Sequence, residues 1–316
     1  MIILKNSFFI KITFVTFLAY FFITATAFAQ DDSIKRSFDV DFGGTLTIDT
    51  DLGSIEVETA NNEKVEIEII MDARDRDDLE RLREEFDIDF KHSGDDVMVT
   101  MENKRKSRWG NWWRNGRRWK VRFFVTVPRR YNLDMRTSGG GISVEDLEGE
   151  VYAKTSGGGL DFGNIKGRVE GKTSGGSIRL GEVDGDVDVH TSGGSIHIDR
   201  ARGDVVAKTS GGSIRVDEVF GAIQAGTSGG SVTARISKQP TSDCRLTTSG
   251  GTVTVYMVKN IDVTVDARTS GGRVYTDFPV TVRGEISKRS LRAKINDGGP
   301  ELYLRTSGGN ISLKEM

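Results

Sequence analysis

Apolar and polar residues alternate in short runs along most of the chain, and the alternation returns at a fixed interval. The tetrapeptide Thr-Ser-Gly-Gly begins at Thr137, Thr155, Thr173, Thr191, Thr209, Thr227, Thr248, Thr269 and Thr306. The first five intervals are 18 residues, the next two are 21 and the last is 37. A fixed short period is typical of a stacked architecture in which each repeat contacts only its neighbours.

Each repeat contains two apolar runs with the period of a strand that buries one face. With threonine as position one, positions six, eight, fifteen and seventeen are apolar. At position seventeen the residue is also small in most repeats. Position thirteen is glycine, at Gly149, Gly167, Gly185, Gly203 and Gly221. We expect glycine at both corners because the backbone there needs φ values that other residues adopt poorly. The pattern predicts an all-β fold, a right-handed parallel β-helix or solenoid with coils of about 18 residues over residues 137–316.

Residues 30–136 are less regular but are expected to continue the solenoid as an N-terminal β region. Residues 45–49 and 54–58 alternate as strands around a degenerate corner at 51–53, and Val65–Ile69 predicts another strand. In the charged segment 72–85, Leu79 and Leu82 with Phe86 follow helical spacing, so one short helix is expected there. It would cap the open end of the stack, while residues 300–304 and 310–313 would close the far end.

Residues 1–29 have the pattern of a secretory signal peptide. Lys5 and Lys11 lie before an apolar run at residues 12–23. The run is followed by small residues at Ala25–Ala29. The strongly apolar stretch is shorter than the roughly 20 residues of a spanning helix, so cleavage after Ala29 is expected rather than retention as an anchor. The mature chain is therefore expected to be exported, as a periplasmic, cell-surface or secreted protein without a membrane anchor.

Composition leaves little material for a metal or cofactor site. The chain has 38 glycines, 4 prolines, 1 cysteine and 3 histidines, and its formal net charge is −2. Cys244 has no partner for an internal disulfide. His190 and His197 fall in different ladders of the predicted stack, which implies no third ligand, so neither zinc nor a cofactor is expected. The corners also lack the spacing of a calcium β-roll. Stacked carboxylates, such as Asp199 with Asp217, are read as outward charges, with glycan cleavage or calcium binding as the alternative.

The T-S-G-G-x-I corners carry a family resemblance, together with Val127-Pro128 before Tyr131-Asn132-Leu133 and the closing run Asn296–Pro300. They resemble the bacterial putative-adhesin β-strand-repeat family, over about residues 36–315. The resemblance implies an adhesin-like β-helix of unknown function. It implies no common chemistry, no catalytic residues and no cofactor.

One segment, residues 104–120, departs from the repeat and is the best candidate contact site. It holds eight basic residues, no acidic residue and all four tryptophans of the chain. The candidate ligand-binding residues are Arg105, Arg108, Trp109, Trp112, Trp113, Arg114, Arg117 and Arg118. Tryptophan suits an interface, and arginine makes bidentate contacts to phosphate or carboxylate. An exposed loop would therefore bind an anionic glycan, lipopolysaccharide or a membrane surface. The alternative is that these rings cover the solenoid; Trp119 is expected to be structural. Export argues against nucleic acid as the partner.

Three functions follow from this pattern. The favoured one is a non-catalytic, exported, adhesin-like solenoid that binds a surface polymer or envelope component. The second is a polysaccharide-acting enzyme of the β-helix class, which the absence of cleft-forming insertions in the regular coils disfavours. The third is a periplasmic scaffold that assembles end to end through exposed strand edges. No oligomeric state follows from the sequence.

Overall fold

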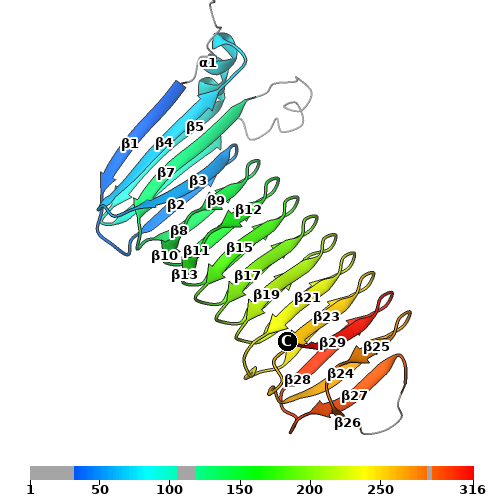
Figure 1. Cartoon of the computed structure of the whole chain (residues 1–316). Coiled ribbons are helices and arrows are strands. Elements are labelled where there is room, and N and C mark those ends of the chain that lie inside the picture. The colour runs from blue at the N-terminus through cyan, green and yellow to red at the C-terminus, as the bar shows by residue number, and fades with distance from the viewer. Residues whose placement is uncertain (1–31, 105–118, 283–286) are drawn as a thin grey trace, which may run out of the picture.

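The chain folds into an elongated stack of coils (Figure 1), which confirms the predicted all-β solenoid. The computed structural model describes residues 32–104, 119–282 and 287–316. Within these ranges the strands form two sheets, of 15 and 14 strands, and one helix, α1 (Arg76–Glu85), lies at the N-terminal end.

The first sheet is built from the strands that follow the Thr-Ser-Gly-Gly corners and from the N-terminal strands that stack on them. Its strands are β1 (Asp32–Asp39), β3 (Ser54–Ala60), β4 (Lys64–Asp72), β7 (Lys120–Pro128), β9 (Ile142–Val144), β10 (Leu147–Glu148), β12 (Leu160–Phe162), β13 (Ile165–Lys166), β15 (Ile178–Val183), β17 (Ile196–Ala201), β19 (Ile214–Val219), β21 (Val232–Ile236), β23 (Val253–Met257), β25 (Val274–Thr276) and β29 (Ile311–Glu315).

The second sheet lies across the core and is built from the strands that lead into the corners. Its strands are β2 (Thr45–Thr50), β5 (Phe86–Ser93), β6 (Asp96–Asn103), β8 (Asn132–Thr137), β11 (Val151–Thr155), β14 (Val169–Thr173), β16 (Val187–Thr191), β18 (Val205–Lys208), β20 (Ile223–Thr227), β22 (Cys244–Thr248), β24 (Val263–Thr269), β26 (Val280–Val282), β27 (Ser290–Ile295) and β28 (Glu301–Thr306).

Equivalent residues of successive regular coils pair laterally, in parallel register. Ile178 pairs with Ile196 in the first sheet, and Val187 pairs with Val205 in the second. The predicted apolar positions point into the space between the sheets, where they are almost fully buried. The core is thus one continuous column, because each coil buries its apolar face only against the coils on either side.

The corner threonines form a buried ladder along this column. The Thr191 hydroxyl donates to the Gly176 carbonyl at 2.8 Å and accepts from the Gly194 N–H at 3.3 Å. The same pair of bonds recurs at the corners of Thr173, Thr209 and Thr227. Each threonine therefore satisfies a backbone donor of its own corner and a carbonyl of the preceding one.

Replacing Thr191 by valine is expected to lower the free energy of unfolding by about 1–3 kcal/mol. Valine keeps the shape but leaves the Gly176 carbonyl and the Gly194 N–H without this partner. Thr233→Val is the matched control, because Thr233 lies on the outer, partly exposed face of β21; its effect should stay within about 0.5 kcal/mol. Urea unfolding followed by circular dichroism measures both. Equal losses would contradict the ladder's role.

The corner glycines are required for a reason other than the one expected from the sequence. Among the glycines of the repeated corners only Gly167, with φ +154°, has a φ in the positive range. A Cβ at the second glycine of a corner would instead collide with the backbone of the preceding coil, as at Gly194 against Gly176. The expectation of unusual φ values was therefore wrong at these corners, and close approach of the coils replaces it.

The C-terminal end of the stack does not follow chain order. In the second sheet β28 lies between β22 and β24, and in the first sheet β29 lies between β23 and β25. Figure 1 shows the last coil, in red, inside the end of the rod. The expectation that residues 300–304 and 310–313 close the far end was therefore wrong. The antiparallel strands β27 and β26 extend the second sheet beyond β24 instead.

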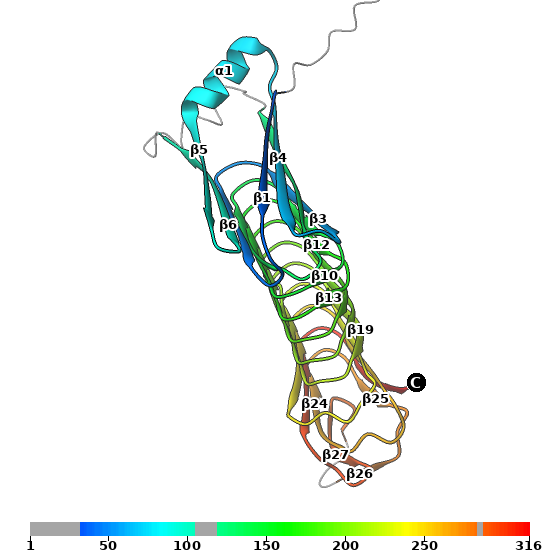
Figure 2. The same ribbon diagram turned by 90° about the vertical axis from the view of Figure 1, so that its left-hand side faces the viewer.

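The predicted helix is present as α1 at the N-terminal end, where antiparallel strands rather than the helix form the ends of both sheets. The helix follows β4 of the first sheet and leads directly into β5 of the second, so it links the two sheets at the end of the rod (Figure 2). Asp75 caps the helix by accepting a hydrogen bond from the Asp78 N–H at 2.9 Å. Its own residues Leu79 and Leu82 are buried. The edge strands here are β1 and β5.

No helix within the described ranges is long and apolar enough to cross a membrane. The predicted signal peptide, residues 1–29, lies outside those ranges, so its cleavage stays a prediction.

Candidate functional site

The eight residues predicted as the contact site all lie outside the described residues. They are Arg105, Arg108, Trp109, Trp112, Trp113, Arg114, Arg117 and Arg118. The flanking residues are described: the Lys104 N–H donates to the Glu85 carbonyl at 2.9 Å, and Trp119 is buried edge-on against Phe86, with ring centroids 6.3 Å apart. Trp119 is thus structural, as expected. The described residues on either side, Lys104 and Trp119, therefore both lie beside the C-terminal end of α1.

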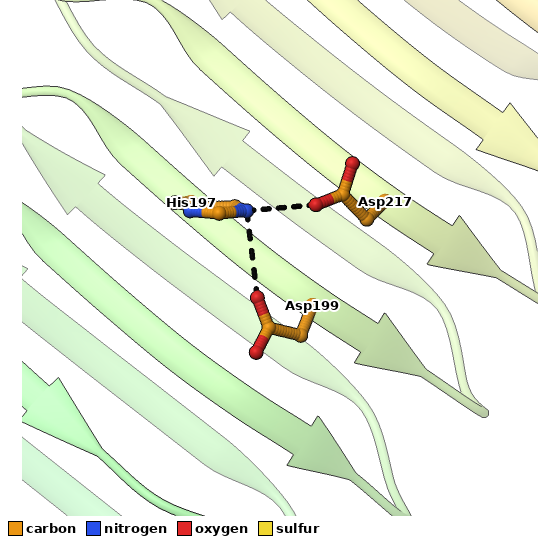
Figure 3. Close-up of side chains that lie close together, drawn as sticks. All are labelled: His197, Asp199 and Asp217. Atoms are coloured by element: carbon orange, nitrogen blue, oxygen red, sulfur yellow. Dashed lines mark hydrogen bonds and ion pairs between the residues drawn. The ribbon is translucent and has the colours of Figure 1, made fainter.

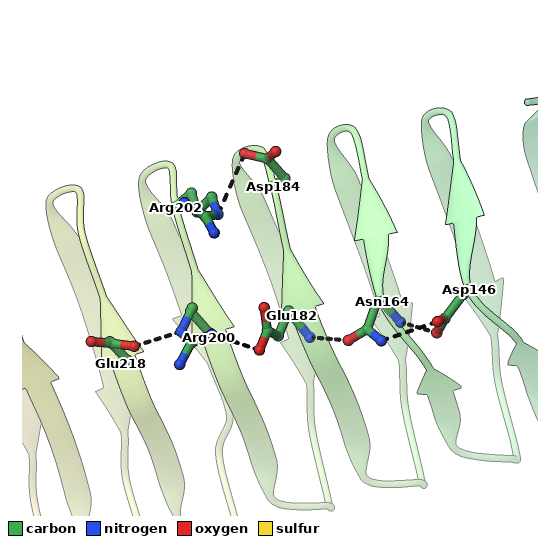
Figure 4. Close-up of polar contacts among 7 residues, drawn as sticks. All are labelled: Asp146, Asn164, Glu182, Asp184, Arg200, Arg202 and Glu218. Atoms are coloured by element: carbon green, nitrogen blue, oxygen red, sulfur yellow. Dashed lines mark hydrogen bonds and ion pairs between the residues drawn. The ribbon is translucent and has the colours of Figure 1, made fainter.

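Several outward charges of the regular coils pair with one another. Along one ladder, Asn164 links Asp146 to Glu182, and Arg200 bridges Glu182 and Glu218 (Figure 4). The Arg200 guanidinium lies 2.6 Å from the Glu182 carboxylate. Arg202 and Asp184 form a further, looser pair at 3.9 Å. These groups pair with each other, and three carboxylates against one arginine leave the ladder with an excess of negative charge, so it offers no cationic site to an anionic ligand.

The carboxylates that an enzyme would need gather in an open hollow on the outer face of β3, β9 and β12. The hollow has a volume of about 630 Å³, and its acidic residues are Glu56, Glu58, Glu145, Asp146 and Asp161. Hydrogen bonds from the Asn164 backbone and side chain lower the pKa of Asp146. A glycosidase general acid requires the opposite shift. Asp146 therefore does not suit the role of general acid.

The described residues contain a cationic cluster that the sequence did not reveal. It lies on the outer face of β22, β28, β24 and β27, and we call it the Arg–Tyr cluster; its residues are Arg245, Asp266, Arg268, Arg292, Tyr303 and Arg305. Lateral register brings them together, because Tyr303 pairs with Arg245 on one side and with Asp266 on the other, and Asp266 pairs with Arg292.

One carboxylate holds three guanidinium groups in this cluster. Asp266 lies 3.0 Å from Arg305, 3.3 Å from Arg292 and 3.4 Å from Arg268. Partial burial raises the pKa of Asp266, but hydrogen bonding and charge from the arginines, Arg305 first, outweigh it and lower the pKa. Asp266 is therefore ionised at neutral pH, and its single charge leaves the three arginines with an excess of two positive charges.

The Tyr303 ring contacts two guanidinium groups of the cluster. The Arg305 guanidinium lies 3.9 Å from the centroid of the Tyr303 ring, and the Arg245 guanidinium lies 4.1 Å from it. These stacked contacts hold both arginines in place. Arg305 also donates to the Asp266 and Leu304 carbonyls, so the more exposed arginines are the ones that can meet an external anion. The Arg292 side chain is 64% exposed, and the Arg268 side chain 46%. The cluster thus presents arranged, partly solvent-facing donors for an anion.

Chain order hides this cluster. Arg245 and Arg305 are 60 residues apart in the sequence and become near neighbours because β28 inserts between β22 and β24. The only signal within the sequence is the outward-facing arginine and tyrosine positions of these strands.

Comparison with known families gives one match over most of the chain. The family described as Toastrack DUF4097 matches residues 44–314. A search of curated proteins finds no relative of this chain.

Several solved structures resemble the fold at low sequence identity. A "putative lipid binding protein" from Parabacteroides distasonis is 13% identical, with a TM-score of 0.41, over 89% of this chain and 96% of the other. A "putative adhesin" from Bacteroides fragilis is 15% identical, with a TM-score of 0.34, over 90% of this chain and 98% of the other. With identities this low, the function has to be inferred from the chain's own residues.

Proposed function

Since the chain belongs to the Toastrack DUF4097 family, whose function is not established, we propose that it is a non-catalytic, adhesin-like solenoid that binds an anionic polymer of a cell surface or envelope. The observation that carries this proposal is the Arg–Tyr cluster, in which one carboxylate opposes three arginines. Guanidinium groups bind carboxylate and phosphate through paired N–H donors. The ligand groups are therefore the carboxylates or phosphates of a glycan, lipopolysaccharide or membrane surface.

The predicted cationic segment 105–118 supplies a second contact in this proposal. Its described flanks lie at the α1 end of the rod, whereas the Arg–Tyr cluster lies near the opposite end (Figure 1). Ten strand-to-strand steps separate β6 from β24 in the second sheet, which at ~4.8 Å each gives a span of about 50 Å. A long polyanion engaging both regions would gain avidity. Export by the predicted signal peptide would place the rod where such polymers occur.

The rest of the outer face supports a binding role over a catalytic one. The ladder through Arg200 is internally paired, and the acidic hollow at β3, β9 and β12 has Asp146 with a lowered pKa. A rigid stack with local charge excess suits attachment to a repetitive polymer, because the stack holds its donors in place before binding.

The double variant Arg245→Gln/Arg292→Gln is expected to weaken polyanion binding at least about tenfold, since each arginine contact to an anion contributes over about a kilocalorie per mole. These two arginines are chosen because Arg305 and Asp266 also hold the strands together. The matched control is Arg202→Gln, which removes an exposed charge paired with Asp184; its effect should be less than about twofold.

Three probes distinguish the sources of the anion: an acidic polysaccharide, lipopolysaccharide, and vesicles of phosphatidylglycerol. Titration at low and high salt should show binding that weakens with salt. Replacing Arg114, Arg117 and Arg118 by glutamine tests the second contact in parallel. The proposal fails if none of the probes binds, or if the control variant loses as much affinity as the Arg–Tyr cluster variant.

A further inference from the structure

Two carboxylates and a histidine converge on the outer face of the first sheet, far from the Arg–Tyr cluster. Strands β17 and β19 are parallel neighbours, and the register that pairs Ile198 with Val216 places Asp199 beside Asp217. His197 lies two residues before Asp199 and so points to the same side of the sheet. Figure 3 shows both carboxylates facing one nitrogen of the imidazole. The sequence pattern pairs His197 with no further ligand, because His190, its one companion considered there, falls in a different ladder; the register brings two carboxylates to it instead.

One ring nitrogen of His197 faces both carboxylates. His197 Nε2 lies 2.9 Å from Asp217 Oδ2 and 3.4 Å from Asp199 Oδ1, and one ligand atom from each residue lies within 4.8 Å of the others. A single N–H donates well to only one acceptor, so a proton on Nε2 gives a good hydrogen bond to only one of the two carboxylates. A divalent cation bound to all three groups would balance both carboxylates.

Two of the three distances between ligand atoms are compatible with a shared metal ion. Ligand atoms held ~2.1 Å from one ion are separated by ~3.0 Å at a right angle and ~3.4 Å at the tetrahedral angle. The two distances from Nε2, 2.9 and 3.4 Å, fall on these values. Small rotations of the exposed Asp199 side chain, which is 62% exposed, would bring its carboxylate into range of the same ion.

The neighbouring side chains leave the ligand atoms accessible. Arg215 donates to Asp217 Oδ1 at 2.8 Å, so Oδ2 keeps its position facing His197. Partial burial raises the pKa of Asp217, but hydrogen bonds from Arg215 and His197 outweigh it and lower the pKa. The register flanks His197 with Arg179 and Arg215.

We propose that His197, Asp199 and Asp217 bind a divalent transition-metal ion, with Zn²⁺ as the best fit. Imidazole nitrogen with two carboxylate oxygens is a ligand set typical of Zn²⁺, whereas Ca²⁺ prefers oxygen ligands alone. Three protein ligands on an open sheet face leave further coordination positions to water or to an external donor group. The site is independent of the anion contact proposed above.

His190 provides a matched control within the same chain. It also forms a pair with an aspartate two residues earlier, since His190 Nε2 lies 2.6 Å from Asp188 Oδ1. Its lateral neighbours are Lys172 and Lys208, and Glu170, which stands beside Asp188, is paired with Lys172 at 2.7 Å. Among the described residues, His190 therefore belongs to no group of three converging ligand atoms. Both histidines are partly exposed, so their replacement perturbs the fold to a similar extent.

Isothermal titration of the full, untagged chain with ZnCl₂, after removal of metal by EDTA, tests the site. One ion per chain should bind with a Kd of about 1–10 μM. His197→Ala and Asp217→Asn should each weaken binding at least about tenfold, with circular dichroism spectra unchanged, whereas His190→Ala should leave it unaltered. Co²⁺ should give a visible absorption band that His197→Ala abolishes.

Three results would overturn the proposal. They are the absence of saturable Zn²⁺ binding below about 1 mM, equal binding by the His197→Ala variant, and an equal loss in His190→Ala. Displacement of Zn²⁺ by an equal concentration of Ca²⁺ would likewise contradict the role of the imidazole. Since the Arg–Tyr cluster contains none of these residues, polyanion binding by the His197→Ala variant separates this test from that of the proposed function.

Discussion

Replacing Gly140 by alanine is expected to lower the free energy of unfolding by about 3 kcal/mol or more, although alanine adds only one methyl group. A Cβ at Gly140 would overlap the carbonyl group of Gly53 and the backbone nitrogen of Ser54 in the neighbouring coil. These are backbone atoms of β-paired coils, so they cannot rotate away. The overlap must be relieved by separating the two coils, which weakens the ladder between them.

Gly139→Ala is the control for this prediction, because Gly139 is the preceding residue of the same corner. The nearest atom to a Cβ there is Leu52 Cδ1 at 3.8 Å, an ordinary contact. The free energy of unfolding should therefore fall by less than about 1 kcal/mol. The lower conformational entropy of the unfolded chain with alanine offsets part of this loss. Urea unfolding followed by far-ultraviolet circular dichroism compares the two variants. Similar losses would show that close approach of the coils is not what requires glycine.

Replacing Phe162 by alanine is expected to lower the free energy of unfolding by about 3–5 kcal/mol. Phe162 is 2% exposed and occupies the rung between Val144 and Leu180 in the column of position-eight residues. Strand pairing fixes the spacing of the coils above and below, so the core cannot collapse into the cavity. Thermal unfolding should then begin at a lower temperature than in the native chain.

Phe162→Leu tests whether volume or aromatic character matters at that rung. Leucine is already the residue of the next rung, Leu180, so this variant should lose less than about 1.5 kcal/mol. Calorimetry of both variants measures the difference. A leucine variant as unstable as the alanine variant would mean that the ring makes a contact that an aliphatic side chain cannot replace.

The repeat was enough to predict the coils because all regular coils make the same contacts. Inward positions such as Ile178 and Val187 could be assigned by counting from the threonine, and lateral register then followed from the 18-residue interval. The helix over Arg76–Glu85 was also predictable, since Leu79 and Leu82 share one face. The physical reason for the corner glycines was not, because close approach depends on the coil above and leaves no mark on local φ.

By itself, the sequence determined the solenoid, because its contacts recur at one spacing, and the N-terminal helix, because its apolar residues share one face. Only the tertiary structure decided where charges meet. Insertion of β28 beside β24 places Arg305 against Asp266, and the reach of His197 across to β19 brings it to Asp217. Such contacts depend on which coils are adjacent and on how side chains reach from one coil to the next. A repeat pattern specifies neither of these once the order of the coils departs from the order of the chain.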